Sequence, residues 1–286
     1  ANKLKVFAAA QNAPFADQFH ALLDIWGKNK SLEIAANFNT SIKSALTSKN
    51  IVGAEHLKAF LDAQPKDTKP AISMQGDPVH PGAPGQLMMA AALLKDLKAN
   101  GFVSSATLDA TGKVVESKGC LIENAKSEKD ILTFTRLDES LPFPIPQGTR
   151  VVIPLCPTIL ELSDYTLKVL GLTAEKYVLK INKTLVATVT ASELSAGINL
   201  TNFATGPIEK QSKAILDAVA AKEAIVGAFR TASKSATMQN AADDAKQKVD
   251  TLKTAVEGAD EKIRLAAKPT KLEFEISPAK EATPAK

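Results

Sequence analysis

Four regions follow one another along the chain, and the spacing of their hydrophobic residues distinguishes them. In residues 1–105 the apolar positions have helical spacing, as at Phe19, Leu22 and Trp26. Residues 13–17 interrupt that spacing as a short extended segment. The alternation of helices with a short extended segment predicts the edge of an α/β layered domain.

The hydrophobic period changes to two in residues 106–205, which predicts a β-rich region. Residues 177–181 and 185–189 alternate apolar and polar positions on either side of a two-residue turn at 182–183, the pattern of a β-hairpin. Five prolines fall within residues 142–157, and they restrict strands there to short or edge positions.

Helical spacing returns in residues 206–268, which predict two long helices. A capping box from Thr190 to Glu193 predicts a brief helix before them. The second long helix carries a seam that needs a partner, and we favour an antiparallel hairpin with the first helix over a coiled-coil oligomer. Residues 269–286 predict a final strand and a polar tail. The seam consists of Ala242, Ala245, Val249, Leu252, Val256, Ala259, Ile263 and Ala266.

The composition is that of a globular protein, with 45% hydrophobic residues and a formal charge of +4 among 286 residues. Lysines alternate with acidic residues along the chain, which argues against a nucleic-acid interface. No apolar run approaches the roughly 20 residues of a membrane helix, and no signal peptide opens this sequence. Cys120 and Cys156 are compatible with one disulfide or with two buried thiols.

Candidate chemistry concentrates between Asp77 and His80. A carboxylate three residues before a histidine can share one loop with it, and Pro81 biases His80 toward an extended conformation. Pro84 suits the first turn of a helix that continues to about residue 97. An imidazole beside a carboxylate at the start of a helix can act as a general base near neutral pH. The alternative is a structural loop with a solvated histidine.

This stretch, DPVHP at residues 77–81, resembles the last sequence block of SGNH (GDSL-type) hydrolases, in which D-x-x-H-P precedes the final helix of the esterase domain. Other segments resemble a secreted, planctomycete-type branch of that family and its β-rich extension. These segments are PFADQF at 14–19, SDYTLKV at 163–169, GLTAEKY at 171–177, GP at 206–207 and FEISP at 274–278.

The resemblance implies the C-terminal part of a flavodoxin-like three-layer α/β sandwich, followed by a β-rich extension and a two-helix hairpin. It also implies a carboxylic-ester hydrolase without cofactor or metal, secreted or periplasmic, with acylated carbohydrate as one candidate substrate class. His80 would take the proton of a serine nucleophile and Asp77 would orient His80.

The sequence departs from the family where the nucleophile and the oxyanion donors are expected, because neither G-D-S nor G-x-N-D occurs in it. The missing part is a partner chain or cleaved fragment that completes the sheet, an upstream segment, or a part that has been lost. We therefore carry two hypotheses. The chain is the His–Asp portion of an esterase, or it is a non-catalytic structural or surface-assembly protein on an SGNH-derived scaffold.

Other candidate residues have simpler explanations. We expect His20 and His56 to be structural or surface residues, because neither has metal-ligand spacing. Met88 and Met89 lie in the helix that follows the motif, and we expect them to be core residues. We expect Trp26 to pack against its neighbours, with stacking on a sugar as the alternative role.

Overall fold

The computed structural model describes residues 2–47, 53–63, 72, 75–76, 80–237 and 243–279. The chain divides into two compact units. One comprises residues 1–99 and 148–159, and the other comprises residues 100–147 and 160–286. Of the described helices, none combines the length and the apolar composition that crossing a membrane would require.

The described part of residues 2–99 is helical, and its backbone pairing is limited to an isolated antiparallel bridge between Gly76 and Pro81. The expected sheet edge is therefore not found among these described residues, and the sheets of this mixed α/β chain lie in the other unit. The helices of this part are α1 (Asn2–Ala10), α2 (Gln18–Ala45), α3 (Ala54–Asp62) and α4 (Ala83–Asp96).

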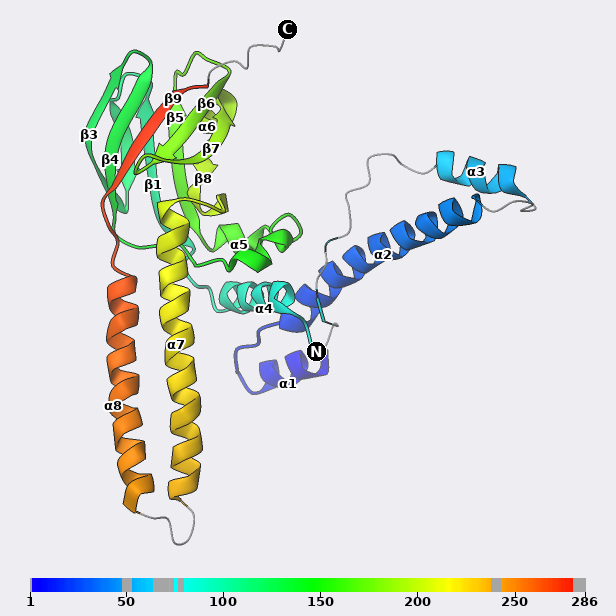
Figure 1. Cartoon of the computed structure of the whole chain (residues 1–286), viewed down its shortest axis with the longest axis vertical. Coiled ribbons are helices and arrows are strands. Elements are labelled where there is room, and N and C mark those ends of the chain that lie inside the picture. Colours follow the sequence, from blue (N-terminus) through cyan, green and yellow to red (C-terminus); the bar gives the residue numbers. More distant parts are fainter. Residues whose placement is uncertain are drawn as a thin grey trace. The chain divides into compact units, whose positions relative to one another are not determined.

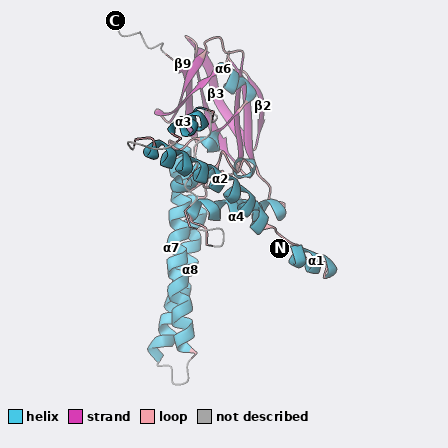
Figure 2. Ribbon diagram, turned by 90° about the vertical axis from the view of Figure 1, so that its right-hand side faces the viewer, coloured by secondary structure: helices cyan, strands magenta, loops and turns pink. Residues whose placement is uncertain are grey.

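The second unit contains two sheets that face each other, as Figure 2 shows. The four-stranded sheet has the order β2 (Val114–Lys118), β1 (Phe102–Asp109), β5 (Asp164–Leu170), β8 (Ile198–Asn199). The five-stranded sheet has the order β3 (Cys120–Glu128), β4 (Ile131–Asp138), β9 (Leu272–Pro278), β6 (Lys176–Ile181), β7 (Thr184–Thr190). All the strand pairs are antiparallel except β1 with β5. The prolines predicted short or edge strands in residues 142–157, whereas residues 139–163 form no strand and contain η1 (Gln147–Val152) and α5 (Thr158–Glu161).

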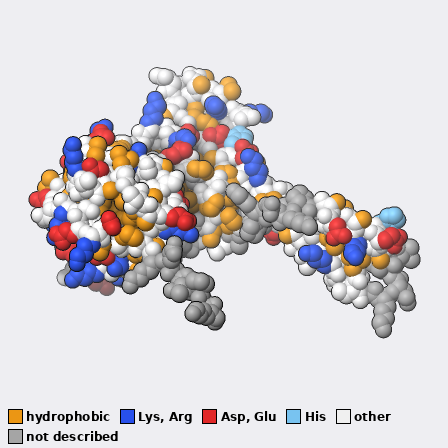
Figure 3. All heavy atoms as spheres, turned by 90° about the horizontal axis from the view of Figure 1, so that it is seen from above, with side chains coloured by type: hydrophobic (Ala, Val, Ile, Leu, Met, Phe, Trp, Pro, Cys, Tyr) orange, Lys and Arg blue, Asp and Glu red, His pale blue; other side chains and the backbone are white. Residues whose placement is uncertain are grey.

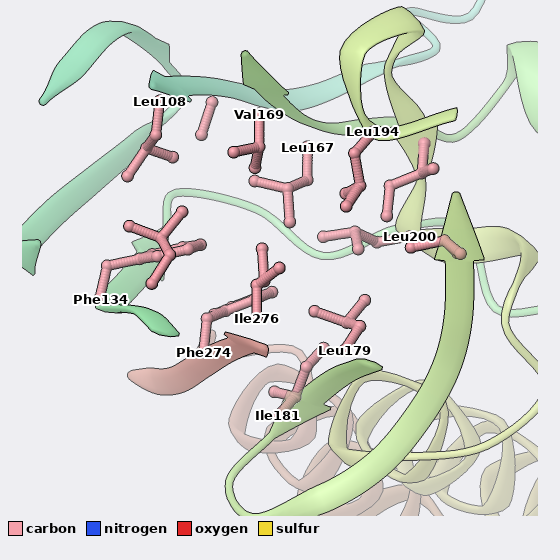
Figure 4. Packing of buried hydrophobic residues seen from close by; sticks show 14 of the residues in the cluster. Leu108, Phe134, Leu167, Val169, Leu179, Ile181, Leu194, Leu200, Phe274 and Ile276 are labelled. Atoms are coloured by element: carbon pink, nitrogen blue, oxygen red, sulfur yellow. The ribbon is translucent and has the colours of Figure 1, made fainter. Parts of the chain in front are cut away.

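The core fills the space between the two sheets, as Figure 4 shows. Leu167 and Val169 of β5 and Leu179 and Ile181 of β6 have no exposed surface, because alternate side chains on each strand point inward. On neighbouring strands of one sheet, Phe134 and Phe274 are cross-strand partners, and their rings stack with centroids 4.8 Å apart.

Three local predictions in this unit are confirmed. β6 and β7 form an antiparallel hairpin, and Asn182 and Lys183 between them both have the positive φ that a tight two-residue turn requires. Thr190 and Glu193 form the capping box of α6 (Ala191–Ala196). The final strand, β9, buries Leu272, Phe274 and Ile276 between β4 and β6.

Two long helices, α7 (Pro207–Ala236) and α8 (Asp243–Ala266), lie side by side in Figure 1. Gln211 donates a hydrogen bond to the carbonyl of Lys268, and Lys222 forms an ion pair with Asp260 at 2.5 Å. These pairs run in opposite directions along the two helices, so the contact is antiparallel. The described seam positions of α8 are buried or half-buried, with Ala259 only 5% exposed.

A buried polar cluster joins the two sheets. Arg136 of β4 has no exposed surface and donates through Nε to Asp138 Oδ1 at 2.8 Å and through Nη2 to Ser104 Oγ of β1 at 2.7 Å. The Tyr165 hydroxyl of β5 donates to the second carboxylate oxygen of Asp138. Period-two spacing in β4 thus continues through Arg136 and Asp138, and it turns Leu137 toward the other face. This cluster was not predicted from the sequence.

Candidate functional site

The predicted helix after the D-x-x-H-P motif is confirmed as α4, with Pro84 in its first turn and Gly82 as its N-cap. Leu87, Met88 and Ala91 are buried, as expected for its core face. The helix ends close to the expected residue 97, and Leu97 itself is 58% exposed. The motif therefore lies immediately before a helix that is anchored through its first two turns.

Two backbone contacts close the loop before α4. Gly76 and Pro81 form the isolated bridge, and the Gly82 N–H donates to the Gln75 carbonyl at 3.0 Å. Gly76 has a φ of +68°, and a Cβ there would lie 2.2 Å from the His80 carbonyl oxygen. Because only glycine tolerates both this φ and this close approach, Gly76 makes the tight closure possible.

His80 lies inside this closure, and its side chain is exposed. An exposed imidazole is accessible to a reacting group, and it also fits the alternative prediction of a structural loop with a solvated histidine. Asp77, the predicted orienting carboxylate, lies outside the described residues. The structure therefore places His80 of the predicted pair, and the role of Asp77 stays a prediction.

The segment that leaves the loop packs on α4 and α2. Gln86 donates through Nε2 to the Pro81 carbonyl at 3.1 Å. A Cβ at Gly85 would lie 2.5 Å from Pro81 Cβ and 3.2 Å from Leu22 Cδ1. Gly85 therefore provides the space in which Pro81 and the buried Leu22 of α2 approach α4.

A second D-x-x-H sequence, Asp17 to His20, begins α2 and has a structural role. Asp17 is the N-cap: its Oδ1 accepts the His20 N–H at 3.0 Å and its Oδ2 lies 2.7 Å from His20 Nδ1. The side-chain hydrogen bond with His20 lowers the pKa of Asp17, and the backbone hydrogen bond adds to this effect. His20 is thus a structural residue that bonds to the N-cap, while His56 is a surface residue beside Glu55. D-x-x-H spacing alone does not identify a catalytic pair.

Asn29, a polar residue on the inner face of α2, was not predicted from the sequence. Asn29 is only 3% exposed and hydrogen-bonds both backbone groups of Ile72, a residue shortly before the loop. Its spacing of seven from Leu22, on the same helix face, is the signal that could have identified it. Trp26, between them in sequence, is half-buried, and Lys30 Nζ lies 6.0 Å from its ring centroid.

Neither cysteine forms a disulfide: Cys120 is a half-buried thiol and Cys156 is a buried one. Burial raises the pKa of the Cys120 thiol, which disfavours its reactive thiolate form. Among the residues that the structure describes, no group of three or more His, Cys, Asp and Glu side chains is arranged to hold a metal ion.

Comparison with known proteins gives a match of fold. No protein-family model matches the chain, and no curated protein matches it. A solved structure described as BT4096, a gut microbial diltiazem-metabolizing enzyme, is similar with a TM-score of 0.60 and 22% sequence identity. The match covers 79% of this chain and 61% of that chain. This chain therefore spans less than two thirds of the length of the protein that it resembles.

Proposed function

We propose that this chain supplies the acid–base histidine of an SGNH-type carboxylic-ester hydrolase. The observation that carries the proposal is the exposed His80 on a glycine-closed loop at the start of α4. The contacts of Gly76 with Pro81 and of Gly82 with Gln75 hold the two ends of the loop together, and a general base requires a held position.

In the proposed reaction, His80 accepts the proton of a serine hydroxyl as the oxygen attacks an ester carbonyl. His80 then returns the proton to the leaving alcohol, and Asp77 orients the ring and stabilises its imidazolium form. Water repeats the cycle on the acyl-serine. The serine and the oxyanion donors come from a polypeptide segment outside these 286 residues, and acylated carbohydrate in a secreted or periplasmic setting is the proposed substrate class.

Exposed apolar side chains support a missing partner segment. Phe7 of α1 is 65% exposed, Ile34 and Phe38 of α2 are 60% and 55% exposed, and Phe60 of α3 is 42% exposed. The rings of Phe38 and Phe60 pack edge to face with centroids 5.8 Å apart, so these two side chains form one apolar surface across α2 and α3. Large exposed apolar surfaces mark interaction sites. In the proposed three-layer sandwich, the sheet of the partner segment covers this surface.

The similar solved structure supports the proposal in two ways. It is described as an enzyme, and this chain matches 61% of it, so that protein contains additional chain. We propose that the nucleophile of the present protein belongs to a segment equivalent to part of that additional chain.

The test is labelling by a serine-directed phosphonate of the protein as it occurs in its source. The proposal predicts a labelled serine outside these 286 residues, and labelling that His80→Ala slows at least about 100-fold. His56→Ala removes another exposed histidine and should leave the labelling rate unchanged. Labelling at equal rates in the wild-type and His80→Ala proteins would show that His80 is not the base.

The second hypothesis, a non-catalytic assembly protein, is favoured by the same exposed apolar surface. It predicts a protein without a phosphonate-reactive serine, in which His80→Ala leaves partner association unchanged. Figure 3 shows acidic and basic side chains intermixed on the visible face, which argues against a partner recognised by one sign of charge there.

A further inference from the structure

Asn29 occupies a position where an apolar residue is expected. It lies within the 28-residue helix α2 and is 3% exposed, and the other buried residues of this helix are Leu22 and Ile42. Asparagine is a weak helix former, and an amide buried without partners costs free energy. A buried asparagine here therefore requires a compensating interaction.

The compensating interaction is a two-point contact with one backbone residue. Oδ1 of Asn29 accepts the Ile72 N–H at 2.8 Å, and Nδ2 donates to the Ile72 carbonyl. Antiparallel strands exchange the same two hydrogen bonds at each bonded residue pair. The amide thus satisfies both polar groups of Ile72, which is itself half-buried.

Ile72 is close to the His80 loop along the chain. Three peptide steps, at most about 11 Å of extended chain, separate it from Gln75, whose carbonyl accepts the closing bond from Gly82. Leu22, two turns before Asn29 on the same face of α2, meets the leaving segment at Gly85. One face of α2 therefore contacts both Ile72, shortly before the loop, and Gly85 in α4, shortly after it.

We infer that Asn29 is a positioning residue: it holds Ile72, shortly before the Gly76–Gly82 loop, and thereby limits where His80 stands. This inference rests on the proposed function for its catalytic meaning. Its structural content, that the Asn29 contact holds the Gln75–Gly82 closure, is independent of that function. Small displacements of a catalytic group cost large factors in rate, so loss of the contact should lower kcat more than it raises KM.

Amide hydrogen exchange in Asn29→Leu tests the structural content. Leucine is similar in size and a better helix former, yet it cannot bond to Ile72. We expect the Ile72 and Gly82 amides to exchange about tenfold faster or more, while Leu87 and Ala91 in α4 keep their rates. Asn37→Leu, at an exposed position of α2, is the control and should change neither. An unchanged Gly82 rate would overturn the inference.

Asn29→Ser is the second variant, for the case in which a buried leucine distorts α2. Its hydroxyl is too short to span both Ile72 groups, so the same amides should exchange faster while the helical circular dichroism is kept. In the protein that includes the proposed nucleophilic serine segment, both variants should lower kcat at least about tenfold with KM within about twofold. If His80→Ala leaves ester hydrolysis intact, the proposed function fails, while the exchange result still decides the role of the contact. A rise in KM alone, with kcat unchanged, would contradict the positioning role.

Discussion

Replacing Asp138 with alanine should lower the free energy of unfolding of the two-sheet unit by about 3–5 kcal/mol, because it leaves the buried guanidinium of Arg136 without its counter-ion. The Arg136 side chain is 0% exposed and that of Asp138 is 3% exposed, with 2.8 Å between Arg136 Nε and Asp138 Oδ1. After the change, Arg136 keeps only Ser104 Oγ and the Thr166 carbonyl as hydrogen-bond acceptors.

Two further variants give smaller losses with which the effect of Asp138→Ala can be compared. Tyr165→Phe removes one hydrogen bond to the carboxylate but keeps the ring 4.6 Å from the Arg136 guanidinium carbon, and it should cost about 1.5–3 kcal/mol. Burial raises the pKa of Tyr165, so its hydroxyl stays protonated and donates to Asp138. Glu116→Ala breaks an ion pair with Lys118 whose side chains are 55% and 66% exposed, and it should leave the free energy of unfolding almost unchanged because solvent screens the pair.

The assay is urea unfolding, monitored by the strand signal in far-ultraviolet circular dichroism. The free energies of unfolding are compared at a common m-value, the slope of free energy against urea concentration. The expected order of destabilisation is Asp138→Ala, then Tyr165→Phe, then Glu116→Ala. A loss for Asp138→Ala no larger than that for Glu116→Ala would refute the reasoning, because it would mean that the buried guanidinium does not need the carboxylate.

Three further predictions concern separate elements. Thr190→Ala removes the N-cap of α6 and should cost about 1 kcal/mol in urea unfolding; no loss would show that Glu193 alone suffices. Phe274→Ala empties the place of a 2% exposed ring stacked on Phe134 and should cost about 3–5 kcal/mol, and a loss below about 1 kcal/mol would contradict the packing. The pKa of Asp17 is lower in the folded state, so its contribution to stability is present above the unfolded-state pKa and lost as the pH falls through the folded one. The protection factors of the amides at the start of α2 should therefore fall in the wild type as the pH drops through the folded-state pKa of Asp17, and they should stay level in Asp17→Asn.

Elements fixed by local chemistry could be predicted from the sequence. The β6–β7 hairpin follows from alternation around a turn, α6 from its capping box, and α4 from a proline in the first turn and an apolar stripe. In each case the deciding interactions lie within a few residues of one another, so the sequence pattern contains them.

Features that depend on distant partners could not be predicted. Arg136 and Asp138 are polar, and only the approach of Ser104 and Tyr165 from the other sheet allows them to be buried. Asn29 is buried for a similar reason, because Ile72 supplies both of its hydrogen-bond partners. Polar residues with partners far along the chain resemble surface residues in the sequence.

The candidate site also combines features that local sequence predicts with features that depend on distant partners. His80 and the helix after it follow from local sequence, and the structure places the histidine on a closed, exposed loop. The functional meaning of the motif depends on a serine outside these residues. The Asp17–His20 pair shows that the same spacing also serves as a helix cap.

The most direct test of the central claim is the rate of p-nitrophenyl acetate hydrolysis, with and without His80, by the protein that includes the proposed nucleophilic serine segment. Our account predicts that kcat/KM falls at least about 100-fold in His80→Ala and stays within about twofold of the wild type in His20→Ala. Equal rates for the wild-type and His80→Ala proteins would contradict it.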